Sequence, residues 1–461
     1  MQRLFAIAWL TWKAALRFRL FLIVAVLLLA SVVLLPLLIR DDGTARGFTQ
    51  ILLTYTLTTV STLLGLSTLW LSCGTLARDI EECQLQVVAV KPIPRWQIWL
   101  GKWLGIMALN VSLLALSGAS IYGLLQWRAS RLPAEQQKIL RSEVLVARGS
   151  VKPQTVEKEI DEATDKALKE RLQTTRIERV DLVEVRRQIR EQVKAEFQLV
   201  PPGFRKQWEI DLGMARQSLR DKPLQLRIKF NSADQSITRT FDGFWIVGEP
   251  GKTKYWRSEV MSLAPDTFHE FAVPPNLFDE NGILAINFVN PNQVALLFPL
   301  EDGMEVLYPE GGFGLNFVRG LGIIVCWMAL LSALGLAAAS FLSFPVAAFL
   351  SVGILGIVLS SGTMANAVSE GTIGSYNAEK STKGWTPADV VVIPAFKAIL
   401  NVIGLAKDFS PIDSLGTGRS ITWSQLGFAF AQIVVLLSGG LAVLGMVILT
   451  RRELATAQGT Q

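Results

Sequence analysis

The side chains best suited to directed polar contacts gather in one short segment. Arg78, Asp79, Glu81 and Glu82 stand close together, and Arg95 follows after two prolines. Guanidinium and carboxylate groups form charge-assisted hydrogen bonds, which orient a partner strongly. The segment contains no histidine, and nothing in its sequence indicates a cleft. Its side chains are therefore suited to docking a partner rather than to catalysis.

The runs on either side of this segment are uncharged. Residues 47–77 and 103–127 contain no Asp, Glu, Lys or Arg, and about 20 apolar residues suffice to cross a bilayer as a helix. The charged segment, residues 76–101, is therefore predicted to be a short loop between two membrane spans.

The first part of this loop has helical periodicity. Within residues 76–91 the apolar side chains fall three or four positions apart: Leu76, Ile80, Cys83, Val87 and Val90. This spacing predicts an amphipathic helix. Pro92 and Pro94 end it, because proline lacks a backbone donor and restricts the preceding residue. A helix lying on the membrane and leading into a span is a surface on which a partner can push.

The loop resembles the one that follows the second span in ABC-2 type permeases, the membrane subunits of many ABC exporters. The matching positions are Arg78-Asp79, Glu81, Pro92, Arg95 and Leu100-Gly101-Lys102. Cys83-Gln84 replaces the usual Gly-Thr, and Pro94 replaces the usual Ser. An ordinary positively charged loop with two amphipathic turns is the alternative.

The resemblance implies two permease subunits, identical or different, above two cytoplasmic ATPase subunits. It implies that the helix at 76–91 docks in a groove of the ATPase, oriented by charged contacts. The residues expected to couple the two proteins are Arg78, Asp79, Glu81, Glu82, Pro92 and Arg95. ATP and Mg would be bound by the ATPase, so no cofactor is expected in this chain.

Uncharged runs elsewhere predict six spans, arranged as three plus three. A single Arg or Lys in the centre of a span costs about 2.5–3.5 kcal/mol, so the absence of charge is a strong signal. The run 320–369 is long enough for two spans, which we divide near Phe344-Pro345. The runs are 20–39, 47–77, 103–127, 320–369 and 420–450.

Lys and Arg outside the spans predict the orientation, because they favour cytoplasmic loops. The basic residues of the amino-terminal segment, of the 76–101 loop and of the Arg451-Arg452 tail fall on one side of a six-span model. We therefore expect a multi-pass protein of the cytoplasmic (inner) membrane with both termini in the cytoplasm. Residues 128–315 would be extracytoplasmic, and the first run would be an uncleaved anchor preceded by an interfacial helix.

The extracytoplasmic residues divide into two parts by periodicity. In 128–222 apolar residues recur at helical spacing, predicting helices at 156–172 and 182–197. In 223–315 short alternating segments predict the strands of a β-sandwich. The predicted strands are 224–230, 237–247, 268–273, 283–289, 294–299 and 304–308. The fold class is thus an α-helical membrane protein with an inserted α+β domain, made of a helical stalk and a jelly-roll-like sandwich.

Four segments follow from this division: spans 1–3 in 1–127, the stalk in 128–222, the sandwich in 223–315, and spans 4–6 in 316–461. The last segment includes an outer loop, 362–420. Its apolar residues 390–406 are interrupted by Pro394 and Lys397, so we expect a helix at the outer interface that does not cross the bilayer.

Sites for other chemistry are not found in the sequence. Gly248–Thr253 ends like a phosphate-binding loop, but Ile246 stands where the motif needs its first glycine. His269 is the only histidine, which argues against a His-based metal site or a catalytic triad. We expect no catalytic, cofactor-binding or metal-binding residues, and no nucleic-acid partner.

The leading hypothesis is a permease subunit of an ABC-2 type export system that a separate cytoplasmic ATPase drives, in contact with membrane lipid. One alternative is an ATP-driven complex that transmits force to the cell envelope without transport. Another is a membrane-anchored binding protein whose sandwich contacts an extracytoplasmic protein or a glycan.

Overall fold

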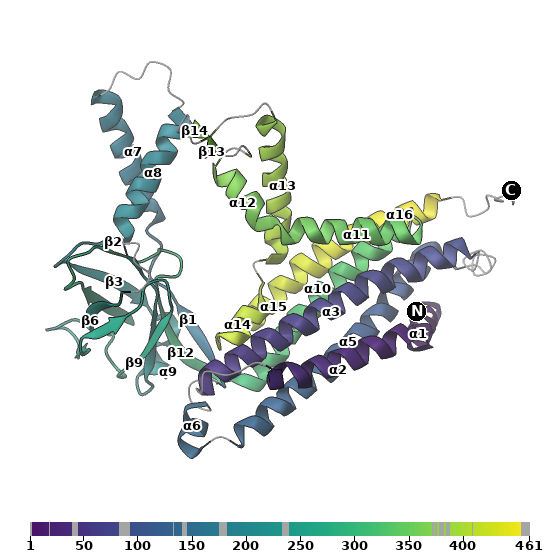
Figure 1. Ribbon diagram of the computed structural model, residues 1–461, viewed down its shortest axis with the longest axis horizontal. Helices are drawn as coiled ribbons and strands as arrows, with labels where there is room; N and C mark the ends of the chain where they lie inside the picture. Colours follow the sequence, from purple (N-terminus) through teal and green to yellow (C-terminus); the bar gives the residue numbers. More distant parts are fainter. Residues whose placement is uncertain are drawn as a thin grey trace. The chain divides into compact units, whose positions relative to one another are not determined.

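The computed structural model describes most of the chain. The described residues are 2–17, 19–38, 45–82, 93–131, 133–140, 145–174, 182–232, 239–370, 373, 376–377, 382–383, 388–407 and 409–452. The chain folds into two compact units (Figure 1). The bundle unit comprises Met1–Val146 and Gly312–Gln461, and the sheet unit comprises Ala147–Gly311.

The bundle unit consists almost entirely of helices. Its elements are α1 (Gln2–Arg17), α2 (Arg19–Leu38), α3 (Ala45–Glu81), α5 (Arg95–Ala129), α6 (Ala134–Ile139), α10 (Phe313–Ala339), α11 (Phe344–Leu359), α12 (Ser361–Glu370), β13 (Tyr376–Asn377), β14 (Thr382–Lys383), α13 (Asp389–Lys407), α14 (Pro411–Gly416), α15 (Trp423–Ala429), the π-helical η3 (Phe430–Ser438) and α16 (Gly439–Arg451).

Five described helices are long and apolar enough to cross a membrane, which indicates a multi-pass membrane protein. They are Ile51–Glu81, Arg95–Ala129, Phe313–Ala339, Asp389–Lys407 and Trp423–Arg451. The pair α11–α12 meets the same test only together, with a bend of 51°. Within α2, the apolar segment Ile23–Leu35 is shorter than the helices that meet this test.

The predicted count of six spans is therefore not confirmed. The predicted division near Phe344-Pro345 agrees with the break between α10 and α11. The region 390–406, in contrast, forms most of α13, with Pro394 inside the helix. By length and composition α13 could cross a bilayer. In Figure 1 α13 stands beside α12 and runs across the direction of α11 rather than alongside it.

Close packing in the bundle depends on small residues. A side chain on Gly335 of α10 would meet the Ser72 Cβ of α3 at 2.6 Å, so these helices approach at their backbones. Gly101 and Gly105 of α5 do the same for α1, where added Cβ atoms would meet Ile7 and Thr11 at 2.8 and 2.7 Å.

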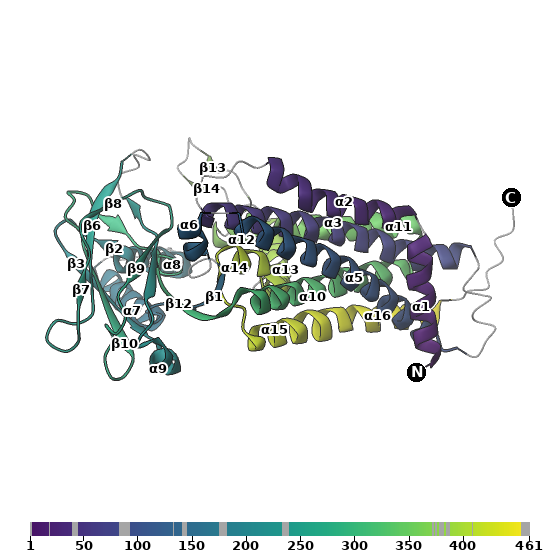
Figure 2. The same ribbon diagram turned by 90° about the horizontal axis from the view of Figure 1, so that it is seen from below.

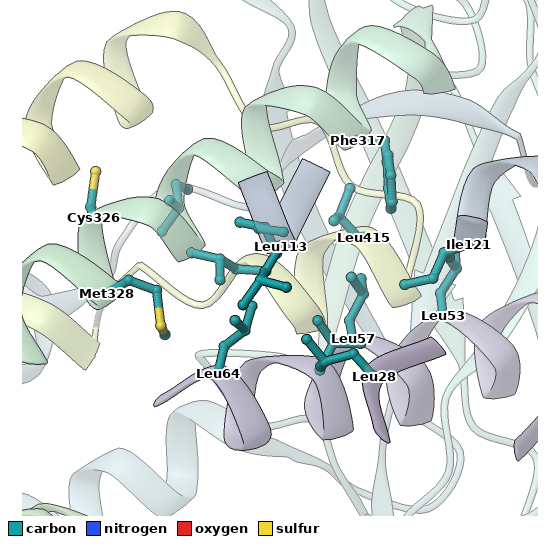
Figure 3. Packing of buried hydrophobic residues seen from close by; sticks show 14 of the residues in the cluster. Leu28, Leu53, Leu57, Leu64, Leu113, Ile121, Phe317, Cys326, Met328 and Leu415 are labelled. Atoms are coloured by element: carbon teal, nitrogen blue, oxygen red, sulfur yellow. The ribbon is translucent and has the colours of Figure 1, made fainter. Parts of the chain in front are cut away.

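Leucines from several helices fill the space between α2, α3, α5 and α10, joined by Phe317 and Leu415 (Figure 3). The segment before α15 is held by an amide: Asn316 of α10 accepts from the Ile421 N–H at 2.7 Å and donates to the Arg419 carbonyl at 2.8 Å.

The sheet unit contains antiparallel strand pairs and two longer helices. Its elements are β1 (Val146–Val151), α7 (Glu157–Thr174), α8 (Leu182–Gln198), β2 (Leu199–Val200), β3 (Arg205–Asp211), η2 (Gly213–Ala215), α9 (Arg216–Leu219), β4 (Leu224–Ile228), β5 (Asn231–Ser232), β6 (Phe241–Val247), β7 (Trp256–Arg257), β8 (Met261–Leu263), β9 (His269–Val273), β10 (Ile283–Val289), β11 (Leu296–Leu297) and β12 (Met304–Gly312).

Two larger sheets enclose one core. One has the strand order β1-β12-β4-β9, and the other has the order β3-β10-β6-β7 with β8 paired to β6. Leu226 and Val306 from the first sheet lie in the same hydrophobic cluster as Trp245 and Ile286 from the second. Each predicted strand has a counterpart, although the observed strands are often shorter.

The boundary at residue 222 differs from the prediction. β1 and β3 lie within 128–222, the range predicted to be helical, yet both belong to the larger sheets. The strand β3 has the sequence Arg-Lys-Gln-Trp-Glu-Ile-Asp. Its many charged residues obscure the alternation of the apolar Trp208 and Ile210, so the sequence does not indicate a strand here. The compact unit is accordingly Ala147–Gly311.

The two predicted helices are confirmed as α7 and α8, which pack as a hairpin. Their apolar faces meet through Ile160, Val185 and Ile189. Exposed ion pairs lie beside this contact: Arg186 with Asp165 at 2.9 Å and Arg190 with Asp161 at 3.3 Å.

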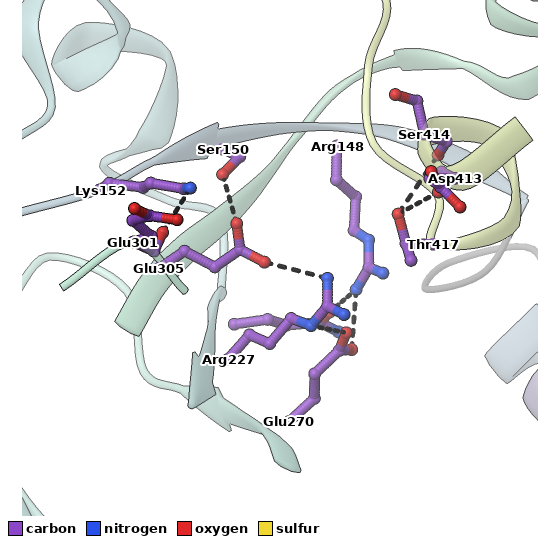
Figure 4. Close-up of polar contacts among 11 residues, drawn as sticks. Arg148, Ser150, Lys152, Arg227, Glu270, Glu301, Glu305, Asp413, Ser414 and Thr417 are labelled. Atoms are coloured by element: carbon purple, nitrogen blue, oxygen red, sulfur yellow. Dashed lines mark hydrogen bonds and ion pairs between the residues drawn. The ribbon is translucent and has the colours of Figure 1, made fainter. Parts of the chain in front are cut away.

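A buried ionic network lies on the first sheet, on the face opposite the core (Figure 4). Arg227 of β4 contacts Glu305 of β12 at 3.0 Å, and Arg148 of β1 contacts Glu270 of β9 at 3.0 Å. These side chains are at most 13% exposed. An unpaired charge there would be costly, and these pairs join side chains from all four strands of the sheet.

Lys206 of β3 provides a test of the sheet unit. Its Nζ donates to the Phe197 carbonyl in the last turn of α8, and burial lowers its pKa to about 8 from the ordinary 10.5. Unfolded chains bind a proton at this group up to about pH 10.5, whereas the folded chain releases it near pH 8. Its contribution to stability therefore rises with pH across that window.

We predict that Lys206 in the folded, full-length protein reacts with acetic anhydride with a midpoint near pH 8. Labelling would be measured by mass spectrometry and scaled to its own plateau at high pH, with exposed Lys254 recorded in parallel. A midpoint near 10.5 would show that the amine is not buried as described.

Candidate coupling site at one end of the bundle

The charged residues singled out in the sequence lie where several helices end. Arg78, Asp79 and Glu81 occupy the last turn of α3, which runs without interruption to Glu81. Residues 76–81 are thus the end of a long helix rather than the start of a separate one. The remainder of the predicted helix, 83–91, and Pro92 lie outside the described residues.

Asp79 joins α3 to α5. Its Oδ2 lies 2.5 Å from the Lys102 Nζ, which also donates to the Thr75 carbonyl at 2.9 Å. The Lys102 side chain is 8% exposed and that of Asp79 is 33% exposed. An ammonium group this deeply buried needs its carboxylate, because removal of one partner leaves an uncompensated charge.

Glu81 joins α3 to α11. Its Oε1 accepts from the Phe344 N–H at 2.9 Å, which satisfies a backbone donor at the start of α11, where the N-cap Ser343 provides no side-chain cap. A carboxylate at a helix amino terminus also interacts favourably with the helix dipole. The Arg78 guanidinium lies over the Phe344 ring, 4.7 Å from its centroid, and Trp70 packs edge-on against the same ring.

Arg95 joins α5 to α16. Its Nη1 donates to the Leu449, Thr450 and Arg452 carbonyls at 2.8, 2.9 and 2.7 Å. These carbonyls belong to the carboxyl end of α16, whose last acceptors have no partner within the helix. Arg452 in turn donates to the Ser340 carbonyl at the end of α10, at 3.1 Å.

We call this set the helix-end clamp: Arg78, Asp79, Glu81, Arg95, Lys102 and Arg452. It brings together four of the six predicted coupling residues. Glu82 is exposed at the end of α3 and Pro92 lies outside the described part of the chain. The clamp connects the ends of α3, α5, α10, α11 and α16.

Lys102 and Arg452 belong to the clamp but are not among the coupling residues predicted from the sequence. One signal was available for Lys102: Asp79 closely follows the run 47–77 and Lys102 immediately precedes the run 103–127. Opposite charges at the same edge of two adjacent spans favour a pair. Arg452 gave no such signal, because its contact is with a carbonyl 112 residues away.

The segment that resembles a phosphate-binding loop and the single histidine both make structural contacts. Gly248–Thr253 forms a turn between β6 and β7, in which the Thr253 N–H donates to the Glu249 carbonyl at 2.9 Å. His269 Nε2 contacts the Ala264 carbonyl at 2.7 Å, a structural contact. Among the residues that the structure describes, no group of three or more His, Cys, Asp and Glu could hold a metal.

Comparison of the chain with models of known protein families, with curated proteins and with solved structures found no match. The geometry of the clamp and the sequence pattern around it are therefore the basis for a functional proposal.

We predict that Asp79→Asn destabilises the bundle by about 1–3 kcal/mol, less than for a fully buried pair because Asp79 is partly exposed. Lys102→Met added to Asp79→Asn should restore much of this loss, since the uncompensated ammonium group is then removed. Chemical unfolding of the purified protein in detergent would give the coupling energy of the double-mutant cycle.

The matched control is the exposed pair Arg186–Asp165 in the α7–α8 hairpin, where Asp165→Asn should cost at most about 0.5 kcal/mol. Strictly additive effects of the Asp79 and Lys102 substitutions would contradict the pairing.

Proposed function

We propose that the chain is the membrane subunit of an ABC-2 type ATP-driven export system. A separate cytoplasmic ATPase binds and hydrolyses ATP with Mg, and this chain, paired with a second permease subunit, moves a substrate across the membrane. The observation that carries the proposal is the helix-end clamp. Five of its six residues, all except Arg452, belong to the segment that resembles the ATPase-docking loop of these permeases.

The contacts of the clamp are suited to transmitting motion. Displacement of the end of α3 acts on α5 through Asp79 and Lys102, and on α11 through Glu81 and the Phe344 backbone. Displacement of the start of α5 acts on α16 through Arg95. Because charge-assisted contacts at helix ends resist separation, a push from a partner reaches several helices at once.

A second candidate is a complex that uses ATP to transmit force to the cell envelope without transport. The observation in its favour is the sheet unit, which forms a separate compact body with a helical hairpin. Transport would be distinguished by substrate-stimulated ATP hydrolysis in liposomes, which a pure force transmitter would not show. A simple membrane-anchored binding protein is less favoured, because five apolar helices exceed what an anchor needs.

We predict that Glu82→Lys weakens association with the ATPase at least about ten-fold, because it reverses a charge at the exposed end of α3 on the docking surface. Affinity purification of the tagged full-length chain, with quantitative mass spectrometry of the co-purifying ATPase, would measure the effect. Glu162→Lys, an exposed substitution on α7, is the matched control.

Glu81 is unsuitable for this test because it also caps α11. Glu81→Gln, which keeps an acceptor for the Phe344 N–H, should retain the ATPase. Equal recovery of the ATPase with Glu82→Lys and with Glu162→Lys would count against docking at this end of α3.

We also predict on which side of the membrane the clamp and the sheet unit lie. In a background with Cys73, Cys83 and Cys326 replaced, a cysteine at Lys254 in the sheet unit should react with a membrane-impermeant maleimide from the extracytoplasmic side. A cysteine at Glu82 should react only after the membrane is opened. The reverse pattern would place the clamp outside, out of reach of any cytoplasmic ATPase.

A further inference from the structure

A single arginine interrupts the apolar surface near the start of α10. Arg319 lies about two turns into Phe313–Ala339, one of the described helices able to cross a membrane. Its neighbours Leu315 and Val318 are exposed. Residues 320–339 after it contain no charge, and about 20 such residues match the hydrocarbon thickness of about 30 Å. Arg319 therefore lies at the edge of the hydrocarbon, at the end of α10 that is remote from the clamp.

The beginning of the span Trp423–Arg451 lies beside this part of α10 (Figure 2). A Cβ added to Gly322 would meet the Leu426 Cδ1 at 3.2 Å, so the two helices touch there. One turn earlier on each helix, the Arg319 guanidinium lies over the Trp423 ring, 4.8 Å from its centroid. Because tryptophan at the end of a span is typical of the level of the lipid headgroups, this contact holds the guanidinium at that level.

The Arg319 guanidinium is only partly used by the chain. Its Nη1 donates to the Ile421 carbonyl at 2.8 Å, and its Nε is buried without a hydrogen-bond partner. Its Nη2 is accessible and has no partner within the described part of the chain. No carboxylate of the described residues forms an ion pair with it. An arginine in a span that lacks an acidic partner in the chain needs another counter-charge.

Trp423 provides a second free donor at the same place. Its side chain is 60% exposed, and its indole N–H has no partner among the described residues. An indole at a membrane surface places its apolar ring against the lipid and its N–H toward a polar group. The Arg319 Nη2 and this N–H are therefore available to one acceptor group.

The surroundings indicate which group this is. Because exposed apolar side chains flank Arg319 along α10, the groups that reach it belong to the bilayer. A lipid phosphate has the acceptor oxygens that a guanidinium binds strongly. The ammonium of a zwitterionic headgroup would find no carboxylate paired with Arg319, and the Trp423 ring already carries the guanidinium. A headgroup with net negative charge is therefore favoured.

We propose that Arg319 and Trp423 bind the phosphate headgroup of an anionic phospholipid, in the leaflet at this end of the bundle. The Arg319 Nη2 and the Trp423 N–H donate to the phosphate oxygens, and the acyl chains lie along the apolar surface of the two spans. The proposal requires that these helices cross the membrane, but it is independent of whether the chain exports a substrate or transmits force.

The test uses the full-length protein in detergent, titrated with dioleoyl phosphatidylglycerol or with dioleoyl phosphatidylcholine and measured by native mass spectrometry. Excess ammonium phosphate tests a free phosphate ion as the occupant. The variants are Arg319→Gln, Arg319→Lys and Trp423→Phe, which keeps a ring under the guanidinium but removes the N–H. Arg220→Gln, at an exposed arginine that follows α9, is the matched control because it removes the same charge.

Phosphatidylglycerol should bind the parent at least about five-fold more tightly than phosphatidylcholine. Arg319→Gln should weaken phosphatidylglycerol binding about ten-fold, the loss expected for one charge-assisted hydrogen bond, and Trp423→Phe about three-fold. Arg319→Lys should lose less than Arg319→Gln, since it keeps the charge without the planar fork. Arg220→Gln should stay within about two-fold of the parent. Phosphatidylglycerol should also raise the Tm of the parent by about 2 °C or more, and this rise should be absent from Arg319→Gln.

Equal binding of the two lipids by the parent would overturn the proposal, as would phosphatidylglycerol binding by Arg319→Gln at the level of Arg220→Gln. Displacement of the lipid by ammonium phosphate would assign the site to a free anion instead. A lower Tm of Arg319→Gln without lipid, followed by the same rise as in the parent when phosphatidylglycerol is added, would assign Arg319 to the fold alone.

Discussion

The nearly buried ammonium group of Lys102 is the constraint on which the bundle depends. It precedes a long uncharged run, so a shift of α5 along its axis would move this charge away from its carboxylate. Asp79 and the Thr75 carbonyl hold it at the end of α3, which fixes the register of these two helices. Gly101 and Gly105 then come to face α1, and Arg95, at the start of α5, reaches the end of α16.

Each unit combines a packed apolar core with a few hydrogen bonds and ion pairs between specific residues. In the bundle unit, those contacts lie at helix ends, where backbone groups otherwise have no partner. In the sheet unit, paired arginines and glutamates link the strands of one sheet.

Periodicity predicted the local elements well. The α7–α8 hairpin and the central strands follow from spacings of 3.6 and 2, which depend only on neighbouring residues. The strand β3 was not predicted, because the charged residues of its outer face obscure the alternation of the inward-facing Trp208 and Ile210. The charges of the docking segment could be read from the sequence, but the contacts that they make could not. Glu81, for example, accepts a hydrogen bond from a backbone amide 263 residues away, and no local sequence pattern encodes such a contact. The number of spans was also not predictable from the sequence, because α13 is apolar enough to cross a membrane although its sequence contains Pro394 and Lys397.

In the proposed mechanism, an ATPase presses on the end of α3. The most direct measurement is site-specific photo-crosslinking in cells, with a photoreactive amino acid at position 82 and a second at position 162 on α7 for comparison. We expect position 82 to capture a protein with a phosphate-binding loop and position 162 not to capture it. Capture of only lipid or of this chain itself at position 82, with the ATPase absent, would contradict docking at this end of α3.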